Sequence, residues 1–195
     1  MRFIGITGGV GAGKSEILGY LAKKPDTRVM LADEIAHELM SPGTECYDRI
    51  SETFGAEDIF LPQGGLDRGK LAAVIFSDEA KRRQMNAIVH PAVRVYVEKE
   101  AAREKQGGKR KLLVLEAALL IEEHYDEICD ELWYIYTSEN IRRQRLKASR
   151  HYTDEKITDM IASQPSEDTF RQACQAVIDN SGDFEDTKRQ IGDKL

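Results

Sequence analysis

Short apolar runs alternate along this chain with stretches whose apolar residues recur at helical spacing. In one run, Leu112–Leu115, every residue is apolar, as is typical of a strand covered on both faces. Because strands that alternate with helices favour a parallel sheet, the pattern predicts an α/β fold. The predicted strands are Arg2–Thr7, Thr27–Leu31, Lys111–Leu115, Leu132–Tyr136 and Ala176–Asp179.

Helical patterns fill the segments between these runs. Helices are predicted at Lys14–Lys23 and at Glu34–Met40, the second closed by the turn Ser41-Pro42-Gly43. No strand is apparent from Thr44 to Gln106, which is too long for a simple crossover. It is predicted to be an inserted helical lobe that binds an acceptor, or else a set of packing helices without a site. Its helices are expected around Tyr47–Phe54, Arg68–Phe76 after the cap Asp67, Glu79–Val89, and from Pro91 to Gly107.

A second irregular segment runs from Ser138 to Gln164 and is unusually basic. A helix is predicted after Ser138, a break at Arg150-His151-Tyr152, and a second helix after the cap Thr153. The first helix carries Arg143, Lys147 and Arg150 on one stripe and Arg142 and Arg145 on an adjacent one. The predicted organisation is a single domain with a core (1–33, 107–137 and 165–195), the lobe (34–106) and a basic lid (138–164).

Composition and charge narrow the classes of function. The chain has 195 residues, 41% of them hydrophobic and 32% charged, as in a soluble globular protein. A net charge of −6 gives no support for nucleic-acid or anionic-membrane binding. No apolar run approaches the ~18 residues of a membrane span, and no leader pattern precedes the first strand. We therefore expect a cytoplasmic protein that acts on small molecules, with no membrane, nucleic-acid or obligate protein partner.

The cysteines and histidines predict neither a disulfide framework nor a zinc site. The three cysteines lie far apart without a Cys-x-x-Cys pair, and the four histidines have no neighbours at metal-ligand spacing. Buried free thiols are the expected state of Cys46, Cys129 and Cys174.

The segment from Gly8 to Ser15 matches the phosphate-binding P-loop, Gly-x-x-x-x-Gly-Lys-Ser, with a predicted strand before it and a helix after it. Glycines let backbone N–H groups approach phosphate oxygens, and the helix N-terminus favours negative charge. Lys14 supplies a charge at the β- and γ-phosphates, and the Ser15 hydroxyl can ligate Mg²⁺. The pattern predicts ATP and Mg²⁺ bound by Gly8, Gly9, Val10, Gly11, Ala12, Gly13, Lys14, Ser15 and Glu16.

Two acids stand where parallel strands end, at the edge that faces ligands in such sheets. Glu116 ends the third strand and could act on Mg²⁺ through water or on the acceptor. Asp33 follows the second strand and could take a proton from an acceptor hydroxyl, or simply cap the next helix. The chain lacks the Asn-Lys-x-Asp segment by which GTPases read guanine. Three functions stay open here: a kinase for one small molecule, a nucleoside-monophosphate or shikimate-type kinase, and a non-catalytic nucleotide switch.

An ordered set of motifs along nearly the whole chain resembles the dephospho-CoA kinases, which phosphorylate the ribose 3′-hydroxyl of dephospho-CoA in the last step of coenzyme A synthesis. The matching segments are Ile6–Ser15, Ala32–His37, Leu66–Arg68, Asn86–Pro91, Glu116–Glu122, Arg145-Leu146 with Arg150 and Gln164, and Val177–Gly182.

The resemblance implies a P-loop core, a helical acceptor lobe and a lid that closes over ATP. It implies Asp33 as general base, Lys14 and Arg145 as catalytic cations and Arg150 as a second lid arginine. It further places His90, Pro91, Glu116 and Leu120 at the acceptor, and Asn180 beside adenine.

The chain departs from the family pattern at three points. Leu31 stands where the family has the first acid of Asp-Ala-Asp, and Ala118 where it has a proline. The spacing from Arg145 to Arg150 varies in the family. The first departure removes whatever role the missing acid has in the family, the second alters the rigidity of one loop, and the third bears on the assignment of Arg150. Asp33 and the P-loop match the family pattern.

Overall fold

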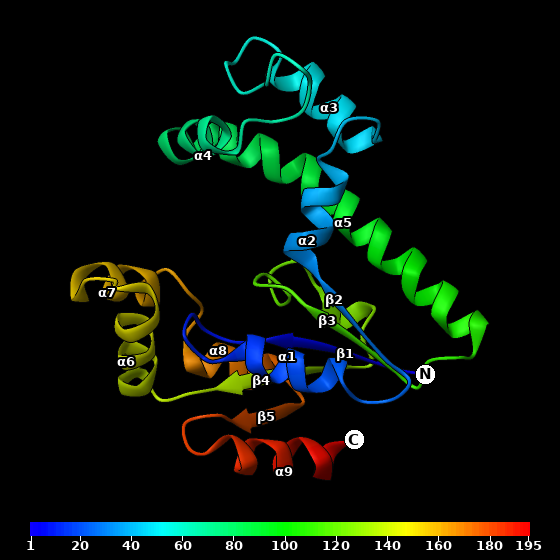
Figure 1. The fold of residues 1–195 in the computed structure, drawn as a ribbon, viewed down its shortest axis with the longest axis vertical. Coiled ribbons are helices and arrows are strands. Elements are labelled where there is room, and N and C mark those ends of the chain that lie inside the picture. Colours follow the sequence, from blue (N-terminus) through cyan, green and yellow to red (C-terminus); the bar gives the residue numbers. More distant parts are fainter. The chain divides into compact units, whose positions relative to one another are not determined.

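The computed structural model describes residues 1–195, and the chain divides into two compact units (Figure 1). Unit 1 comprises Met1–Met30 and Gly107–Leu195, and unit 2 comprises Leu31–Gln106. Unit 1 contains the sheet and unit 2 is built from helices. None of the helices combines the length and the apolar character needed to cross a bilayer.

A five-stranded sheet forms the centre of unit 1, with the order β2-β3-β1-β4-β5. The pairs of β1 with β3, β1 with β4, and β4 with β5 are parallel. The α/β prediction with a parallel sheet is therefore confirmed, and observed and predicted strand ends differ by one residue at most. The strands are β1 (Arg2–Thr7), β2 (Thr27–Leu31), β3 (Leu112–Glu116), β4 (Glu131–Tyr136) and β5 (Ala176–Asp179).

The helices of unit 1 are α1 (Lys14–Ala22), α6 (Glu139–Arg150), α7 (Asp154–Ala162), α8 (Glu167–Ala173) and α9 (Phe184–Lys194), with a short 3₁₀ helix at Tyr125–Glu127. Helices α8 and α9 were not predicted. Each buries only one or two side chains, so its apolar periodicity is weak. Tertiary contacts stabilise α8, whose buried Phe170 stacks on Tyr134 of β4 with ring centroids 4.7 Å apart.

The core of unit 1 lies along β1, β3 and β4. Ile6, Leu113 and Trp133 have no exposed surface. Gly5, at the centre of β1, leaves room for the side chain of Leu132 on β4: a Cβ on Gly5 would lie 2.6 Å from Leu132 Cδ2. A rigid buried sheet of this kind can hold the loops at its ends in fixed positions.

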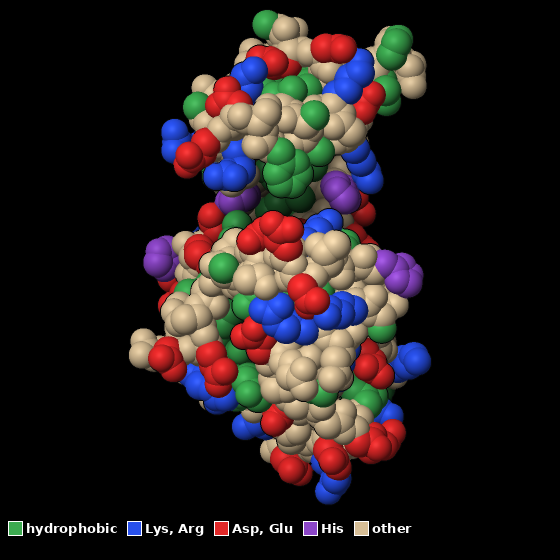
Figure 2. Space-filling model, turned by 90° about the vertical axis from the view of Figure 1, so that its left-hand side faces the viewer, with side chains coloured by type: hydrophobic (Ala, Val, Ile, Leu, Met, Phe, Trp, Pro, Cys, Tyr) green, Lys and Arg blue, Asp and Glu red, His purple; other side chains and the backbone are tan.

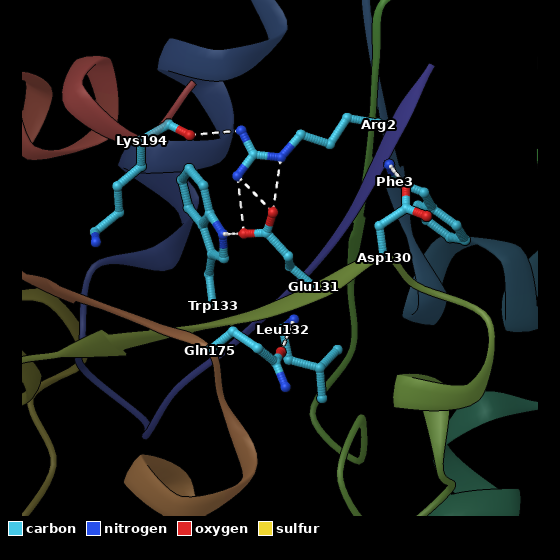
Figure 3. A network of polar contacts seen from close by, with 8 residues as sticks. All are labelled: Arg2, Phe3, Asp130, Glu131, Leu132, Trp133, Gln175 and Lys194. Atoms are coloured by element: carbon cyan, nitrogen blue, oxygen red, sulfur yellow. Dashed lines mark hydrogen bonds and ion pairs between the residues drawn. The ribbon is translucent and has the colours of Figure 1, made fainter.

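A polar network closes the end of the sheet at which β1 and β4 begin (Figure 3). The Arg2 guanidinium donates to both carboxylate oxygens of Glu131, at 2.7 and 2.8 Å from one nitrogen, and Trp133 Nε1 donates to Glu131 at 3.0 Å. Arg2 also donates to the backbone carbonyl of Lys194 at the end of α9. These hydrogen bonds from Arg2 and Trp133 lower the pKa of Glu131. The network ties the first strand to the last helix.

Unit 2 contains α2 (Ala32–Leu39), α3 (Glu45–Phe54), α4 (Arg68–Ser77) and α5 (Glu79–Gly107). Asp67 caps α4 as predicted, since its side chain accepts from the N–H groups of Gly69 and Lys70. The only strand-like feature is an isolated bridge between Phe60 and Leu66.

Two helix boundaries in unit 2 differ from prediction. Helix α5 runs continuously through Pro91, where a new helix had been expected to begin. Proline removes one backbone hydrogen bond, but the buried face of α5 (Met85, Ile88, Val89, Val93 and Val97) continues on both sides of it and outweighs that loss. Helix α2 begins at Ala32, so Asp33 lies in its first turn and does not cap it.

All three cysteines are buried and unpaired, as the sequence predicts. Burial raises the pKa of Cys129 and of Cys174 to about 12, and it also raises the pKa of Cys46. Protonated, buried thiols of this kind are poor nucleophiles.

Candidate functional site

The P-loop joins β1 to α1, and its last glycine shows why the sequence needs one there. Gly13 has φ of 83°, in the left-handed region that side chains avoid. A Cβ at this position would lie 2.4 Å from Asn180 Nδ2. Gly13 is therefore required both by its backbone conformation and by a neighbouring side chain from the end of β5.

One carbonyl of the loop is held from outside by three side chains. Ala12 O accepts hydrogen bonds from Asn180 Nδ2 at 2.8 Å, Thr137 Oγ1 at 3.0 Å and Arg145 at 3.4 Å. In a trans peptide the C=O and the following N–H point in opposite directions. The N–H of Gly13 therefore points away from these side chains, toward the inside of the loop.

Several backbone N–H groups of the loop, among them those of Gly11, Gly13 and Ser15, donate no hydrogen bond to the protein. Those of Gly11 and Gly13 belong to residues that are only partly exposed. They lie at or beside the N-terminus of α1, where the helix dipole favours an anion. Unsatisfied donors and a positive helix end together form a phosphate-binding cradle.

Lys14 and Glu116 come together beside this cradle. Lys14 Nζ donates to Gly8 O at 2.7 Å and lies 3.7 Å from Glu116 Oε1. Glu116 ends β3 and is in register with Ile6 on β1, so the sheet itself places the carboxylate. Both side chains are 18% exposed, so a phosphate entering the loop can still reach the lysine.

The residues expected to hold Mg²⁺ fit that ion. No group of three or more His, Cys, Asp or Glu side chains gathers at a metal site. Mg²⁺ in phosphate sites needs no such group, because phosphate oxygens and water supply most of its ligands. Ser15 carries an exposed hydroxyl in the first turn of α1, and Glu116 offers a carboxylate at the neighbouring strand end.

The basic segment of the sequence forms α6 and α7, which lie beyond the carboxyl end of β4 (Figure 1). Figure 2 views the molecule from the side of these helices and shows a group of Lys and Arg side chains with acidic side chains beside it. Arg145 reaches the loop and also donates to Asn180 O at 2.9 Å. Arg150 lies at the exposed end of α6 beside Tyr152, whose pKa it lowers. Of the two predicted lid arginines, only Arg145 contacts the loop in this structure.

Sequence reasoning assigned no role to three residues that hold the loop: Thr137, Arg142 and Gln164. Arg142 lies one helical turn before Arg145 on the same stripe, so the spacing offered a hint. Thr137 directly follows β4 at the carboxyl edge of the sheet. The contact of Gln164 with Val10 joins residues far apart in sequence, and no local pattern predicts it.

In unit 2 the predicted acceptor residues lie on α2 and α5. Asp33 is exposed and makes no hydrogen bond or ion pair with the protein. One turn further along α2, His37 lines a cavity of about 370 Å³ together with Met40, Ser41, Pro42, Leu61, Gly65, Leu66, Arg68, Leu71, Ala72 and Ile75. Pro91 lines a second cavity of about 330 Å³, and His90 beside it is half-buried.

Leu120 differs from its expected place at the acceptor. Its side chain has no exposed surface, and its Cδ1 would lie 3.2 Å from a Cβ on Gly5. The loop after β3 turns this leucine into the core of unit 1. It packs in the core and supports the sheet.

The family model for dephospho-CoA kinase matches residues 2–186 of the chain, which include the whole P-loop, the lid and the helical unit. The chain belongs to the dephospho-CoA kinase family. It is thus a phosphotransferase of the P-loop fold. A dephospho-CoA kinase from Shouchella clausii is 37% identical over 192 residues, which cover 98% of this chain and 96% of that protein.

Solved structures share the fold of this chain. The protein TT1252 from Thermus thermophilus superposes with a TM-score of 0.78 at 26% identity, covering all of this chain and 96% of that one. The dephospho-CoA kinase from Campylobacter jejuni has a TM-score of 0.70 at 19% identity, with 100% and 96% coverage. At that identity the second likeness shows the shared fold.

Proposed function

We propose that this chain transfers the γ-phosphate of ATP to the ribose 3′-hydroxyl of dephospho-CoA, giving coenzyme A and ADP. The observation that carries the proposal is a P-loop with inward-pointing, unsatisfied N–H groups in a chain of this family. Among the alternatives, a nucleoside-monophosphate or shikimate-type kinase would share the loop. A non-catalytic switch would bind ATP without turnover.

On the nucleotide side, the loop N–H groups and Lys14 would bind the β- and γ-phosphates. Lys14 and Arg145 would stabilise the negative charge that the transferring phosphoryl group spreads over its oxygens. Ser15, with Glu116 acting through water, would hold a magnesium ion that neutralises part of the same charge. Asn180 would border the adenine, and Arg150 would reach the phosphates only after movement of the lid.

On the acceptor side, Asp33 would orient the 3′-hydroxyl and accept its proton. The 3′-oxygen then forms a bond to the γ-phosphorus while the bond from that phosphorus to the β–γ bridging oxygen breaks, and ADP leaves. The Asp33 carboxylate suits this role because no protein group occupies it.

The helical unit would hold the rest of the acceptor. Asp33 and His37 lie one turn apart on α2, and His37 lines the 370 Å³ cavity together with Met40 and Ser41, which follow the end of the helix. An acceptor whose hydroxyl lies at Asp33 could therefore extend along α2 into a largely apolar cavity with His37 and Arg68 on its wall. His90 and Pro91 would contribute from α5.

An acceptor panel tests the proposal directly. ADP release would be measured with ATP and, in turn, dephospho-CoA, adenosine monophosphate, cytidine monophosphate and shikimate. We expect kcat/KM for dephospho-CoA to exceed that of every other acceptor by about a hundredfold or more, since remote contacts contribute to the transition state. Faster turnover of another acceptor would indicate that the chain is a kinase for that acceptor. ATP binding without turnover in the presence of any acceptor would indicate a non-catalytic switch.

The variant Asp33→Asn tests the acceptor side. The amide keeps the size of the side chain but cannot accept the proton, so kcat should fall by about two to four decades with ATP affinity unchanged. Glu34→Gln, the exposed neighbour on the same helix turn, is the matched control. Near-normal turnover of Asp33→Asn would remove Asp33 from the role of general base.

A cytoplasmic setting and action on small molecules alone complete the proposal. They rest on the family's substrates, ATP and dephospho-CoA. Fractionation of cells that express the chain from its own gene would test the cytoplasmic setting, since the chain should then be found in the cytoplasmic fraction.

A further inference from the structure

Two lid residues hold the peptide groups on both sides of Val10 in the P-loop. Arg142 Nε donates to Val10 O at 2.8 Å, and Val10 N donates to Gln164 Oε1 at 3.0 Å. Arg142 also donates to the same Gln164 oxygen at 2.9 Å, which closes a ring of three hydrogen bonds. We call the pair Arg142 and Gln164 the Val10 latch.

The two members of the latch come from opposite ends of the lid. Arg142 lies in the first half of α6, and Gln164 follows the end of α7. The Gln164 backbone is itself fixed, because its N–H donates to Ile161 O at 3.2 Å. The segment between them, which carries the other basic residues, is thus fastened to the loop at both of its ends.

The guanidinium of Arg142 sits directly against the loop. A Cβ on Gly9 would lie 2.5 Å from Arg142 Cζ, so a side chain there would have to displace the guanidinium. Burial lowers the pKa of Arg142, although two acceptor oxygens, one from the loop and one from Gln164, partly replace the lost water. A partly buried cation held by two such acceptors is fixed in orientation.

The latch sets the direction of an N–H group that the loop needs. In the trans peptide that joins Val10 to Gly11, the carbonyl points to Arg142, so the Gly11 N–H points the opposite way. That N–H is one of the loop donors without a protein partner. Ala12 O, held by Asn180, Thr137 and Arg145, orients the N–H of Gly13 by the same geometry.

We propose that Arg142 and Gln164 are positioning residues for ATP: by fixing the Val10 peptides, they preorganise the Gly11 N–H for a phosphate oxygen and couple the loop to the lid. Neither residue needs to touch the nucleotide for this. The inference rests only on the nucleotide-binding half of the proposed function, whatever the acceptor is.

The hydrogen-bond geometry limits which side chains can replace Arg142 and Gln164. Arginine reaches Val10 O and Gln164 with two different nitrogens of one rigid fork, which the single ammonium of lysine reproduces poorly. Gln164 contributes one oxygen that accepts twice, so glutamate can replace it and alanine cannot. Conservative variants therefore separate the latch from simple packing.

Equilibrium binding of ATP without any acceptor, by calorimetry, tests the latch. Arg142→Ala should weaken ATP binding by about tenfold, Arg142→Lys by less, and Gln164→Glu should stay within about twofold of the parent chain. Arg143→Ala is the matched control, because Arg143 neighbours Arg142 but pairs with Glu139 at 2.7 Å and Thr158 at 3.1 Å. In turnover assays, KM for ATP should rise while KM for the acceptor stays constant.

A double-mutant cycle supplies the decisive outcome. If the two residues act as one device, Arg142→Ala with Gln164→Ala should bind ATP about as weakly as Arg142→Ala alone. Additive losses, an equal loss in Arg143→Ala, or a loss in Gln164→Glu as large as in Gln164→Ala would overturn the proposal. ATP binding combined with phosphorylation of some other acceptor would instead overturn the proposed function and leave the latch intact.

Discussion

The two ends of the sheet in unit 1 differ in whether their polar groups are paired within the protein. Where β1 and β4 begin, Arg2, Glu131 and Trp133 satisfy one another, and Asp130 accepts from the N–H of Phe3 at 2.6 Å (Figure 3). Where β1 ends, the carbonyls of the P-loop are tied to neighbouring side chains. The N–H groups of Gly11, Gly13 and Ser15 remain without a partner.

The difference separates stability from binding within one sheet. Paired groups at the first end hold the terminal strand and the last helix together. Donors left without a partner at the other end do not stabilise the free protein, but they can bind a phosphate with no reorganisation. We expect changes at the first end to alter unfolding and changes at the second to alter nucleotide binding and catalysis.

The largest effect should follow Lys14→Ala at the carboxyl end. Loss of the cation beside Gly8 O and Glu116 should lower kcat/KM for ATP by about three decades, the scale for a charge that stabilises the transition state. The melting temperature should hardly change, because Lys14 lies in the phosphate-binding loop and is not part of the hydrophobic core. Steady-state kinetics and a thermal melt measure both, and parent-like kinetics would refute the cradle.

Next comes Gly13→Ala, which tests the shape of the loop. The added Cβ meets Asn180 Nδ2 at 2.4 Å and forces a side chain into the left-handed region. The affinity for ATP should fall by about ten- to a hundredfold. Gly19→Ala, in the helix that follows, is the matched control: nothing lies within 4 Å of its Cβ. It should leave ATP affinity unchanged and raise the free energy of unfolding by about 0.5–1 kcal/mol.

At the opposite end, Glu131→Ala should act on stability alone. It removes the acceptor of Arg2 and of Trp133 Nε1, which should lower the free energy of unfolding by about 1–2 kcal/mol. Chemical denaturation gives this value, and kcat should match the parent chain. Glu185→Ala is the control, because its pair with Lys188 is exposed. A tenfold loss of kcat in Glu131→Ala would break the proposed separation between the two ends.

The smallest expected effect is on the stability of the protein at acidic pH. Because Arg2 and Trp133 lower the pKa of Glu131 below its ordinary value of 4.5, the unfolded chain binds the proton more readily than the folded one. The contribution of Glu131 to stability is therefore fully present above pH ~5 and is lost as the pH falls through the folded-state pKa. Between pH 6 and pH 3 the free energy of unfolding should fall less steeply with pH in Glu131→Gln than in the parent chain. An unchanged slope would show that ionised Glu131 does not contribute to stability.

Local pattern alone determined much of this protein. The strands, the P-loop between β1 and α1, and the cap at Asp67 each follow from residues close together in sequence, because strand alternation, glycine geometry and helix capping are local effects. The family, too, could be predicted from the order of motifs, which the match over residues 2–186 confirms.

Tertiary structure decided the rest. It carried α5 through Pro91, because the helix buries one face on both sides of the proline, and it turned Leu120 into the core. It also determined which arginines contact the loop: Arg142 and Arg145 donate to its carbonyls, while Arg150 lies beside Tyr152, whose pKa it lowers. Charge marks all three alike, and helical spacing only places Arg150 on a different stripe from the other two. The packing of α6 against the loop decides which stripe reaches it, and that packing depends on partners more than a hundred residues away.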